Sequence, residues 1–226
     1  SSLSHAPNFC ASSYRETSVP TSKYLNEKGQ RLPSVTQILD HCWPKPGLIE
    51  WANREGLAGR SHTVVRDRMA KIGTLAHELV FAELGGPAVP SLDESEYPQD
   101  IQQAAKVPLY HARNWFEGKE WEPILVEQPL IARVGFGGTP DWYGMLNGKL
   151  TVLDLKTGRN FAEHGVQLAG YIELLKANDY AVEAAVALYA PRTLTGKANH
   201  TRWEEDSLPV IARAWAAVME LYAVRL

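Results

Sequence analysis

The chain has 226 residues, 45% of them hydrophobic and 22% charged, a balance that suits one globular domain with a sizeable core. Its formal net charge of −3 excludes a globally basic nucleic-acid binder, so any affinity for DNA must come from a local patch or a metal site. A transmembrane helix is excluded as well, because no run of about 18 apolar residues occurs.

Two features of the N-terminal region bear on domain organisation and compartment. Residues 1–22 are rich in Ser, Pro and Thr, and we expect a flexible arm without the segments of a signal peptide. Residues 23–226 are then predicted to form one domain. Cys10 and Cys42 lack metal-type spacing, so we expect free thiols in a reducing, cytoplasmic compartment, away from membranes.

The N-terminal part of the domain is predicted to be mostly helical. A helix begins within residues 32–39, with Ser34 or Thr36 as its cap. A short helix follows over residues 48–55. An apolar stripe at helical spacing predicts one or two helices over residues 63–84.

A basic stretch leads into the helical pattern of residues 63–84. Its cations are Arg54, Arg60, Arg66, Arg68 and Lys71. Such a run is often a solvated helix face, and phosphate contact, with Arg68 as its candidate, is the alternative interpretation. Asp100 is then expected to cap a long helix that reaches Gly118 and is kinked at Pro108.

The remaining patterns alternate between strands and helices. Residues 124–134 alternate in polarity and predict one strand that carries Glu127. Residues 181–190 predict a buried strand, and Trp203 an edge strand. Residues 208–226 predict a final amphipathic helix.

The most informative stretch runs from Gly137 to Tyr171. Asp141 follows a Gly-Gly-Thr-Pro turn, and an apolar run thirteen residues later ends in Asp154-Leu155-Lys156. We expect Asp141 to end one strand and Asp154 to lie on the next. Residues 143–149, with Asn147-Gly148 at their centre, predict a hairpin turn that brings the two carboxylates side by side.

Paired carboxylates at a sheet edge are costly unless a cation neutralises them. Oxygen ligands favour hard cations such as Mg²⁺ or Mn²⁺. Lys156 lies two residues after Asp154 and so shares its strand face. Each residue alone is typical of a turn or a solvated pair, but the combination suits metal-assisted phosphodiester hydrolysis.

These motifs, in this order, resemble the PD-(D/E)xK nuclease superfamily, and within it the RecB-like exonuclease branch with its small phage and mitochondrial members. The matching segments are Gly73-Thr-Leu-Ala-His77, Gly138-Thr-Pro-Asp141, Asp154-Leu-Lys156-Thr-Gly and Gln167-x-x-x-Tyr171. The second acid is Asp rather than Glu. The two cysteines are too few for the iron–sulfur cluster of some members of the branch.

The resemblance implies an α/β fold with a restriction-endonuclease-like core: a mixed central sheet flanked by helices, with a helical N-terminal part. It also implies roles for individual residues. The implied metal ligands are Asp141, Asp154, the carbonyl of Leu155 and His77; the catalytic set adds Lys156 and Glu127; the candidate substrate contacts are Gln167, Tyr171, Ser34 and Arg68.

The implied activity is that of a Mg²⁺- or Mn²⁺-dependent DNA nuclease, more in keeping with an exonuclease than an endonuclease. Its context would be DNA recombination, repair or phage DNA processing, with any recombination or helicase partner on a separate chain. Two alternatives stay open at this point. One is a non-catalytic DNA-binding relative of the same fold, and the other is a phosphoesterase acting on small nucleotides.

Overall fold

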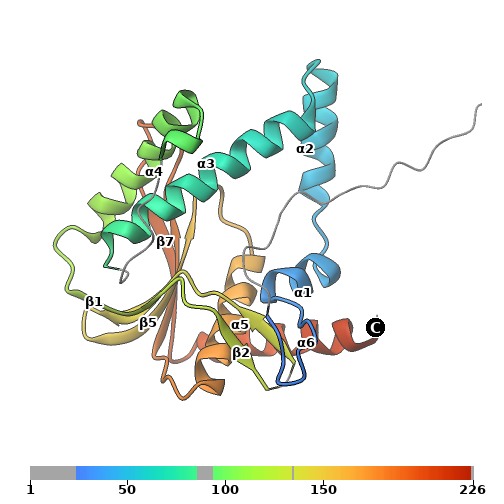
Figure 1. Ribbon diagram of the computed structural model, residues 1–226, viewed down its shortest axis with the longest axis vertical. Coiled ribbons are helices and arrows are strands. Elements are labelled where there is room, and N and C mark those ends of the chain that lie inside the picture. The colour runs from blue at the N-terminus through green and yellow to red at the C-terminus, as the bar shows by residue number, and fades with distance from the viewer. Residues whose placement is uncertain (1–23, 86–93, 134, 225–226) are drawn as a thin grey trace, which may run out of the picture.

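The computed structural model describes residues 24–85, 94–133 and 135–224 (Figure 1). The predicted arm over residues 1–22 and Cys10 lie outside these ranges. The helices are α1 (Val35–Cys42), α2 (Pro46–Leu57), α3 (His62–Glu83), α4 (Gln99–Phe116), α5 (Glu163–Ala177) and α6 (Leu208–Val224), with a 3₁₀ helix η1 (Glu94–Glu96). The strands are β1 (Trp121–Val126), β2 (Leu130–Ala132), β3 (Phe136–Gly138), β4 (Trp142–Leu146), β5 (Lys149–Lys156), β6 (Ala184–Tyr189) and β7 (Asn199–Glu204).

A five-stranded mixed sheet in the order β1-β4-β5-β6-β7 forms the centre of the fold. Its strands pair antiparallel except for β5 and β6, which run parallel and are connected through α5. A parallel pair needs such a crossover because the chain must return to the start of the next strand. Strands β2 and β3 form a separate two-stranded sheet.

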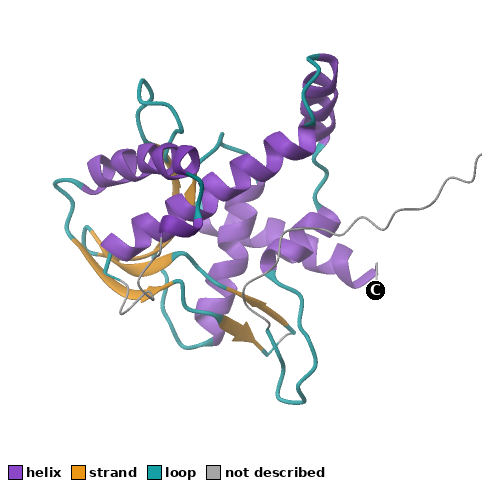
Figure 2. Cartoon of the chain, turned by 45° about the horizontal axis from the view of Figure 1, so that its top comes forward, coloured by secondary structure: helices purple, strands orange, loops and turns teal. Residues whose placement is uncertain are grey.

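Helices cover both faces of the central sheet (Figures 1 and 2). Alternate residues of β5 and β6 point to opposite faces: Val152 and Ala187 pack with α1, α5 and α6, whereas Leu153 and Val186 pack with α3 and α4. This two-sided burial explains the continuous apolar runs of both strands. The mixed α/β class, the helix-flanked mixed sheet and the helical N-terminal part are confirmed.

The β4–β5 hairpin sets the register on which the site depends. Asn147 and Gly148 both have positive φ, 50° and 76°, which a tight two-residue hairpin turn requires. The predicted Asn-Gly turn is confirmed, but its predicted extent was wrong, since β4 continues to Leu146 and β5 starts at Lys149. Asp141 lies just before β4 rather than at a strand end.

The strand predicted over residues 124–134 was wrong, because it is divided between two sheets. Glu127 has a φ of 46° and turns the chain after β1, so that β2 pairs with β3 instead. A non-glycine residue in this region is uncommon and usually held by its surroundings. The backbone N–H of Glu127 donates to the carbonyl of Asp141 at 3.0 Å, which holds this turn.

The helix predictions were correct in kind, with one difference at a cap. Ser34 caps α1 in a capping box with Gln37, as one of the two caps expected. Asp100 does not cap α4, because this helix begins at Gln99 after Pro98. The carboxylate of Asp100 forms an ion pair with Arg68 instead. Helix α2 and the N-terminal half of α3 project from the body (Figure 1). No helix in the described ranges is long and apolar enough to cross a bilayer.

Candidate active site

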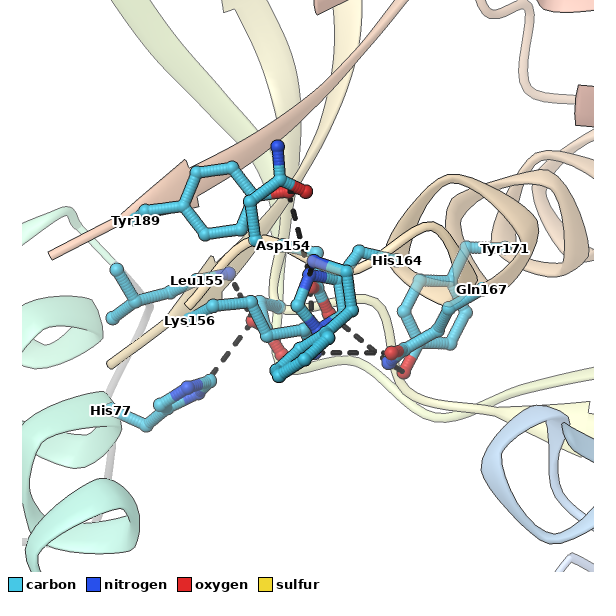
Figure 3. Close-up of polar contacts among 11 residues, drawn as sticks. His77, Asp154, Leu155, Lys156, His164, Gln167, Tyr171 and Tyr189 are labelled. Carbon is cyan, nitrogen blue, oxygen red and sulfur yellow. Dashed lines mark hydrogen bonds and ion pairs between the residues drawn. The ribbon is translucent and has the colours of Figure 1, made fainter. Parts of the chain in front are cut away.

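The candidate site lies at the sheet edge where β5 ends and β4 begins, between α3 on one side and α5 on the other (Figure 3). The hairpin register pairs Trp142 with Leu153, so Asp141 and Asp154 lie one residue beyond that pair. The carboxyl ends of β5 and β6 meet at this edge. Open α/β sheets bind ligands outside such strand ends.

Asp141 is fixed by backbone contacts. Its Oδ2 accepts a hydrogen bond of 2.7 Å from the backbone N–H of Leu155. Burial raises the pKa of Asp141 to about 6, although Lys156 and this hydrogen bond act in the opposite direction. In a strand, the N–H and C=O of one residue point to the same side. The carbonyl of Leu155 is therefore directed toward the same edge as its N–H.

Asp154 is the most deeply buried acid of the site, with a side chain only 1% exposed. Burial raises its pKa to about 6, partly offset by Lys156 and reinforced by the charge of Asp141. Its Oδ2 forms an ion pair of 2.7 Å with the Nζ of Lys156. This ammonium offsets only part of the cost of burying the carboxylate, because the pKa of Asp154 stays raised.

Lys156 is held as an ammonium. Burial would lower its pKa, but the charges of Asp154 and Asp141 outweigh burial and raise it. Its Nζ also donates to the Oε1 of Gln167 at 3.0 Å. A lysine with a raised pKa is a poor general base at neutral pH and a good stabiliser of negative charge.

Gln167 connects the acid, the ammonium and a tyrosine. Its Nε2 donates to the Oδ1 of Asp154 at 3.1 Å and to the hydroxyl of Tyr171 at 2.9 Å. Figure 3 shows both side chains directed from α5 toward β5. The expected shared helical face is confirmed, because the two residues lie one turn apart and contact each other. Both are buried, and these contacts position Asp154 and Lys156.

His77 and Glu127 complete the surroundings of Asp141. The Nδ1 of His77 lies 3.6 Å from the Oδ2 of Asp141. Burial and the charge of Lys156 lower the pKa of His77, so the imidazole is neutral near pH 7, the form that binds metals. Burial and the charge of Asp141 raise the pKa of Glu127. Glu127 is therefore a third carboxyl group close enough to interact electrostatically with Asp141.

These side chains fit a hard cation only in part. Within residues 24–85, 94–133 and 135–224, no three His, Cys, Asp or Glu side chains are grouped closely enough to hold a metal ion by themselves. The two buried carboxylates with raised pKa nevertheless favour a cation here. A backbone carbonyl and water would have to supply the remaining ligands, as is common for Mg²⁺.

Two residues predicted to contact the substrate, Ser34 and Arg68, form contacts within the protein. The hydroxyl of Ser34 accepts from the N–H of Gln37 as the helix cap, and Ser34 bridges to Gly137 of β3. Arg68 is exposed and forms an ion pair of 3.1 Å with Asp100. The structure gives both side chains intramolecular partners, and substrate contact by either stays a prediction.

Sequence reasoning missed a second polar layer beside Lys156. The Nδ1 of His164 lies 3.4 Å from the hydroxyl of Tyr189, which donates to the Oδ1 of Asn160 at 2.8 Å. Burial lowers the pKa of His164 to about 4. A signal was present, because His164 precedes Gln167 by three residues and thus shares the helical face that carries Tyr171.

Comparisons with known proteins give a distant structural likeness. No protein-family model and no curated protein sequence matches the chain. A crystal structure of LHK-Exo in complex with dAMP is similar at a TM-score of 0.38 and 12% identity, covering 86% of this chain and 89% of that one. A second structure, of the alkaline exonuclease LHK-Exo from Laribacter hongkongensis, has a TM-score of 0.35 and 12% identity, covering 66% and 87%.

Proposed function

We propose that this chain is a metal-dependent nuclease that hydrolyses phosphodiester bonds in DNA. One observation carries the proposal: Asp141, Asp154 and Lys156 converge at one sheet edge, where Lys156 stays an ammonium and both acids have raised pKa values. The sequence resemblance to PD-(D/E)xK nucleases supports the same class from the order of the motifs.

The carboxylates of Asp141 and Asp154, the carbonyl of Leu155 and the imidazole of His77 would hold Mg²⁺ or Mn²⁺. When bound, such an ion polarises the phosphate and lowers the pKa of a bound water. Imidazole suits Mn²⁺ better than Mg²⁺. A role for His77 therefore predicts a preference for Mn²⁺.

The protein's own side chains supply charge and orientation. The ammonium of Lys156, held by Asp154 and Gln167, orients the attacking water or stabilises negative charge that develops on the phosphate. Tyr171 holds Gln167 in place through its hydroxyl. Glu127, near Asp141, is a supporting acid, and the hydrolysis forms no covalent enzyme intermediate.

More specifically, the chain would be an exonuclease of the RecB-like branch that acts in DNA recombination, repair or phage DNA processing. It rests on the Gln167-x-x-x-Tyr171 and Gly73-Thr-Leu-Ala-His77 motifs. A recombination or helicase protein would then be a separate partner. The residues 23–226 would act as one nuclease domain.

The test compares the wild type with Lys156→Ala on linear duplex, linear single-stranded and closed circular DNA, each with Mn²⁺, Mg²⁺ or EDTA. Lys149→Ala is the matched control, because it removes an exposed lysine from the other end of the same strand. We expect metal-dependent loss of linear DNA only, reduced by Lys156→Ala about 10²- to 10³-fold, the range for losing one charge-stabilising group. Lys149→Ala should retain full activity.

Other outcomes have definite meanings. Nicking of the closed circle would identify an endonuclease. DNA binding without cleavage under any metal would contradict catalysis and favour a binding relative of the fold. Hydrolysis of small phosphoesters with no action on DNA would favour the nucleotide phosphoesterase.

A further inference from the structure

Arg192 is a partly buried cation beside the candidate site, in the loop after β6. Its Nη2 donates to the Oγ1 of Thr157 at 2.9 Å, and its Nη1 contacts the Sδ of Met69 at 3.3 Å. Neither partner is charged, and among the described residues no carboxylate forms an ion pair with this guanidinium. Its Nε–H is buried without a hydrogen-bond partner.

The position of Arg192 follows from the strand register and from α3. Lys156 of β5 pairs with Tyr189 of β6, and the N–H of Ala190 donates to the carbonyl of Lys156 at 2.8 Å. The loop that carries Arg192 therefore leaves the sheet next to Lys156. Thr157, its hydrogen-bond partner, directly follows Lys156 in the chain.

Helix α3 encloses the guanidinium from the other side. Met69, Gly73 and His77 succeed each other at intervals of four residues, so they share one face of α3. A Cβ at Gly73 would lie 3.5 Å from the Oγ1 of Thr157, which shows how closely this face approaches the end of β5. The face that presents His77 to Asp141 thus also contacts Arg192 through Met69.

A partly buried guanidinium is unfavourable unless an anion accompanies it. Burial lowers the pKa of Arg192, and no carboxylate in the described part of the chain acts in the opposite direction. The planar fork of arginine matches two oxygens of a phosphate. A hydroxyl beside it, here that of Thr157, adds a further donor to the same anion.

We infer that Arg192 and Thr157 form a phosphate-binding position that holds a backbone phosphate of a bound nucleic-acid strand, beside the phosphate that reacts at Lys156. This inference rests on the proposed function, because it takes its ligand from the same strand. The alternative is a purely structural clamp in which Arg192 ties its loop to the end of β5.

The experiment measures the affinity of a labelled single-stranded oligonucleotide in EDTA over a range of salt concentrations. It compares the wild type with Arg192→Gln, Arg192→Lys and Arg213→Gln, the last removing an exposed arginine of α6 as a matched control. Melting temperatures establish that each variant is folded. Strands with hydroxyl and with phosphorylated ends separate backbone from terminal phosphates.

We expect Arg192→Gln to weaken binding roughly 10- to 100-fold and to reduce the slope of log K against log salt by about one. Arg192→Lys should keep the slope and lose several-fold in affinity, because it retains the charge without the fork. Arg213→Gln should change neither. Oligonucleotides with hydroxyl ends and with phosphorylated ends should show the same loss of affinity.

Equal affinity and equal slope in Arg192→Gln and the wild type would overturn the inference in favour of a structural clamp, and so would a loss confined to strands with a phosphorylated end. An absence of wild-type binding would overturn it too. If the wild type binds the oligonucleotide but does not cleave DNA with any of the metals, the proposed function fails. The comparison of Arg192 variants still decides this inference.

A second experiment modifies the oligonucleotide and does not depend on how well Arg192→Gln folds. A single neutral methylphosphonate linkage is moved along the oligonucleotide, and binding is compared between the wild type and Arg192→Lys. The wild type should lose affinity at one linkage where Arg192→Lys loses less. An identical pattern in the two proteins would contradict a contact between Arg192 and the backbone.

Discussion

Burial makes the ionised forms of the two acids of the site unfavourable. Asp141 and Asp154 are buried together, and each has its pKa raised to about 6. The ammonium of Lys156 lies against Asp154, and it does not cancel the cost of burying both charges. Two buried carboxylates with raised pKa values form an environment in which a nearby cation would favour ionisation.

The cost of burying an ionised Asp141 predicts that Asp141→Asn stabilises the protein. The folded-state pKa of Asp141 lies above its unfolded value, so its contribution to stability is greatest below about pH 4 and is lost as the pH rises through about 6. The amide oxygen can still accept from Leu155. In EDTA, denaturant unfolding at about pH 8 should show the variant more stable than the wild type by about 3 kcal/mol.

The same comparison at about pH 4 should show little difference, because Asp141 is then protonated. Adding Mn²⁺ should raise the melting temperature of the wild type and leave Asp141→Asn nearly unchanged. A variant less stable than the wild type at every pH would show that the carboxylate is structural.

At the scale of elements, the site depends on how closely β1, β4 and β5 approach one another. Gly144 lies in the middle of β4 opposite the irregular pairing at Pro123 and Leu125. A Cβ at Gly144 would come within 2.1 Å of the carbonyl oxygen of Glu122. A backbone atom cannot move aside as a flexible side chain can, so only glycine fits here.

Gly144→Ala should therefore destabilise the protein by about 1–3 kcal/mol, or more if β1 is displaced. Gly56→Ala is the matched control, because a Cβ in this part of α2 would meet no atom within 4 Å. Gly56 lies in the last turn of α2, so that change should instead stabilise by about 0.4–1 kcal/mol, chiefly by restricting the unfolded chain. Thermal or denaturant unfolding measures both, and shifts of the same sign would contradict the close approach of β4 to β1.

Element prediction from the sequence succeeded where the signal was local. The Asn147-Gly148 turn and the capping box at Ser34 both follow from neighbouring residues. The strand predicted over residues 124–134 failed because the positive φ of Glu127 is held by the carbonyl of Asp141, fourteen residues away. No local pattern contains that contact.

At the scale of the whole molecule, charge is distributed unfavourably for binding DNA. The chain carries a formal net charge of −3, and Asp141, Asp154 and Glu127 concentrate acid at the sheet edge where a strand would bind. Lys156 and Arg192 lie beside this acid. In EDTA, affinity for a polyanion should therefore depend on these two cations and the acids beside them more than on the surface as a whole.

This distribution predicts that Asp141→Asn binds DNA several-fold more tightly than the wild type in EDTA, because it removes a negative charge at the site. Glu205→Gln is the matched control, since it removes one charge from an exposed position. Fluorescence anisotropy with a labelled oligonucleotide measures both. An equal gain in the two variants would mean that net charge, rather than the charge at the site, governs binding.

The sequence by itself determined the side-by-side placement of Asp141 and Asp154, the Asn-Gly hairpin that aligns them, the shared face of Gln167 and Tyr171, and the α/β class. These depend on spacings of two or four residues and on turn chemistry, which are local. The tertiary structure alone decided that Arg192 lies against Thr157, and that the backbone of Glu127 turns toward Asp141. Such contacts join segments brought together only by the packing of α3 and the return of β6 beside β5, and no local spacing specifies them.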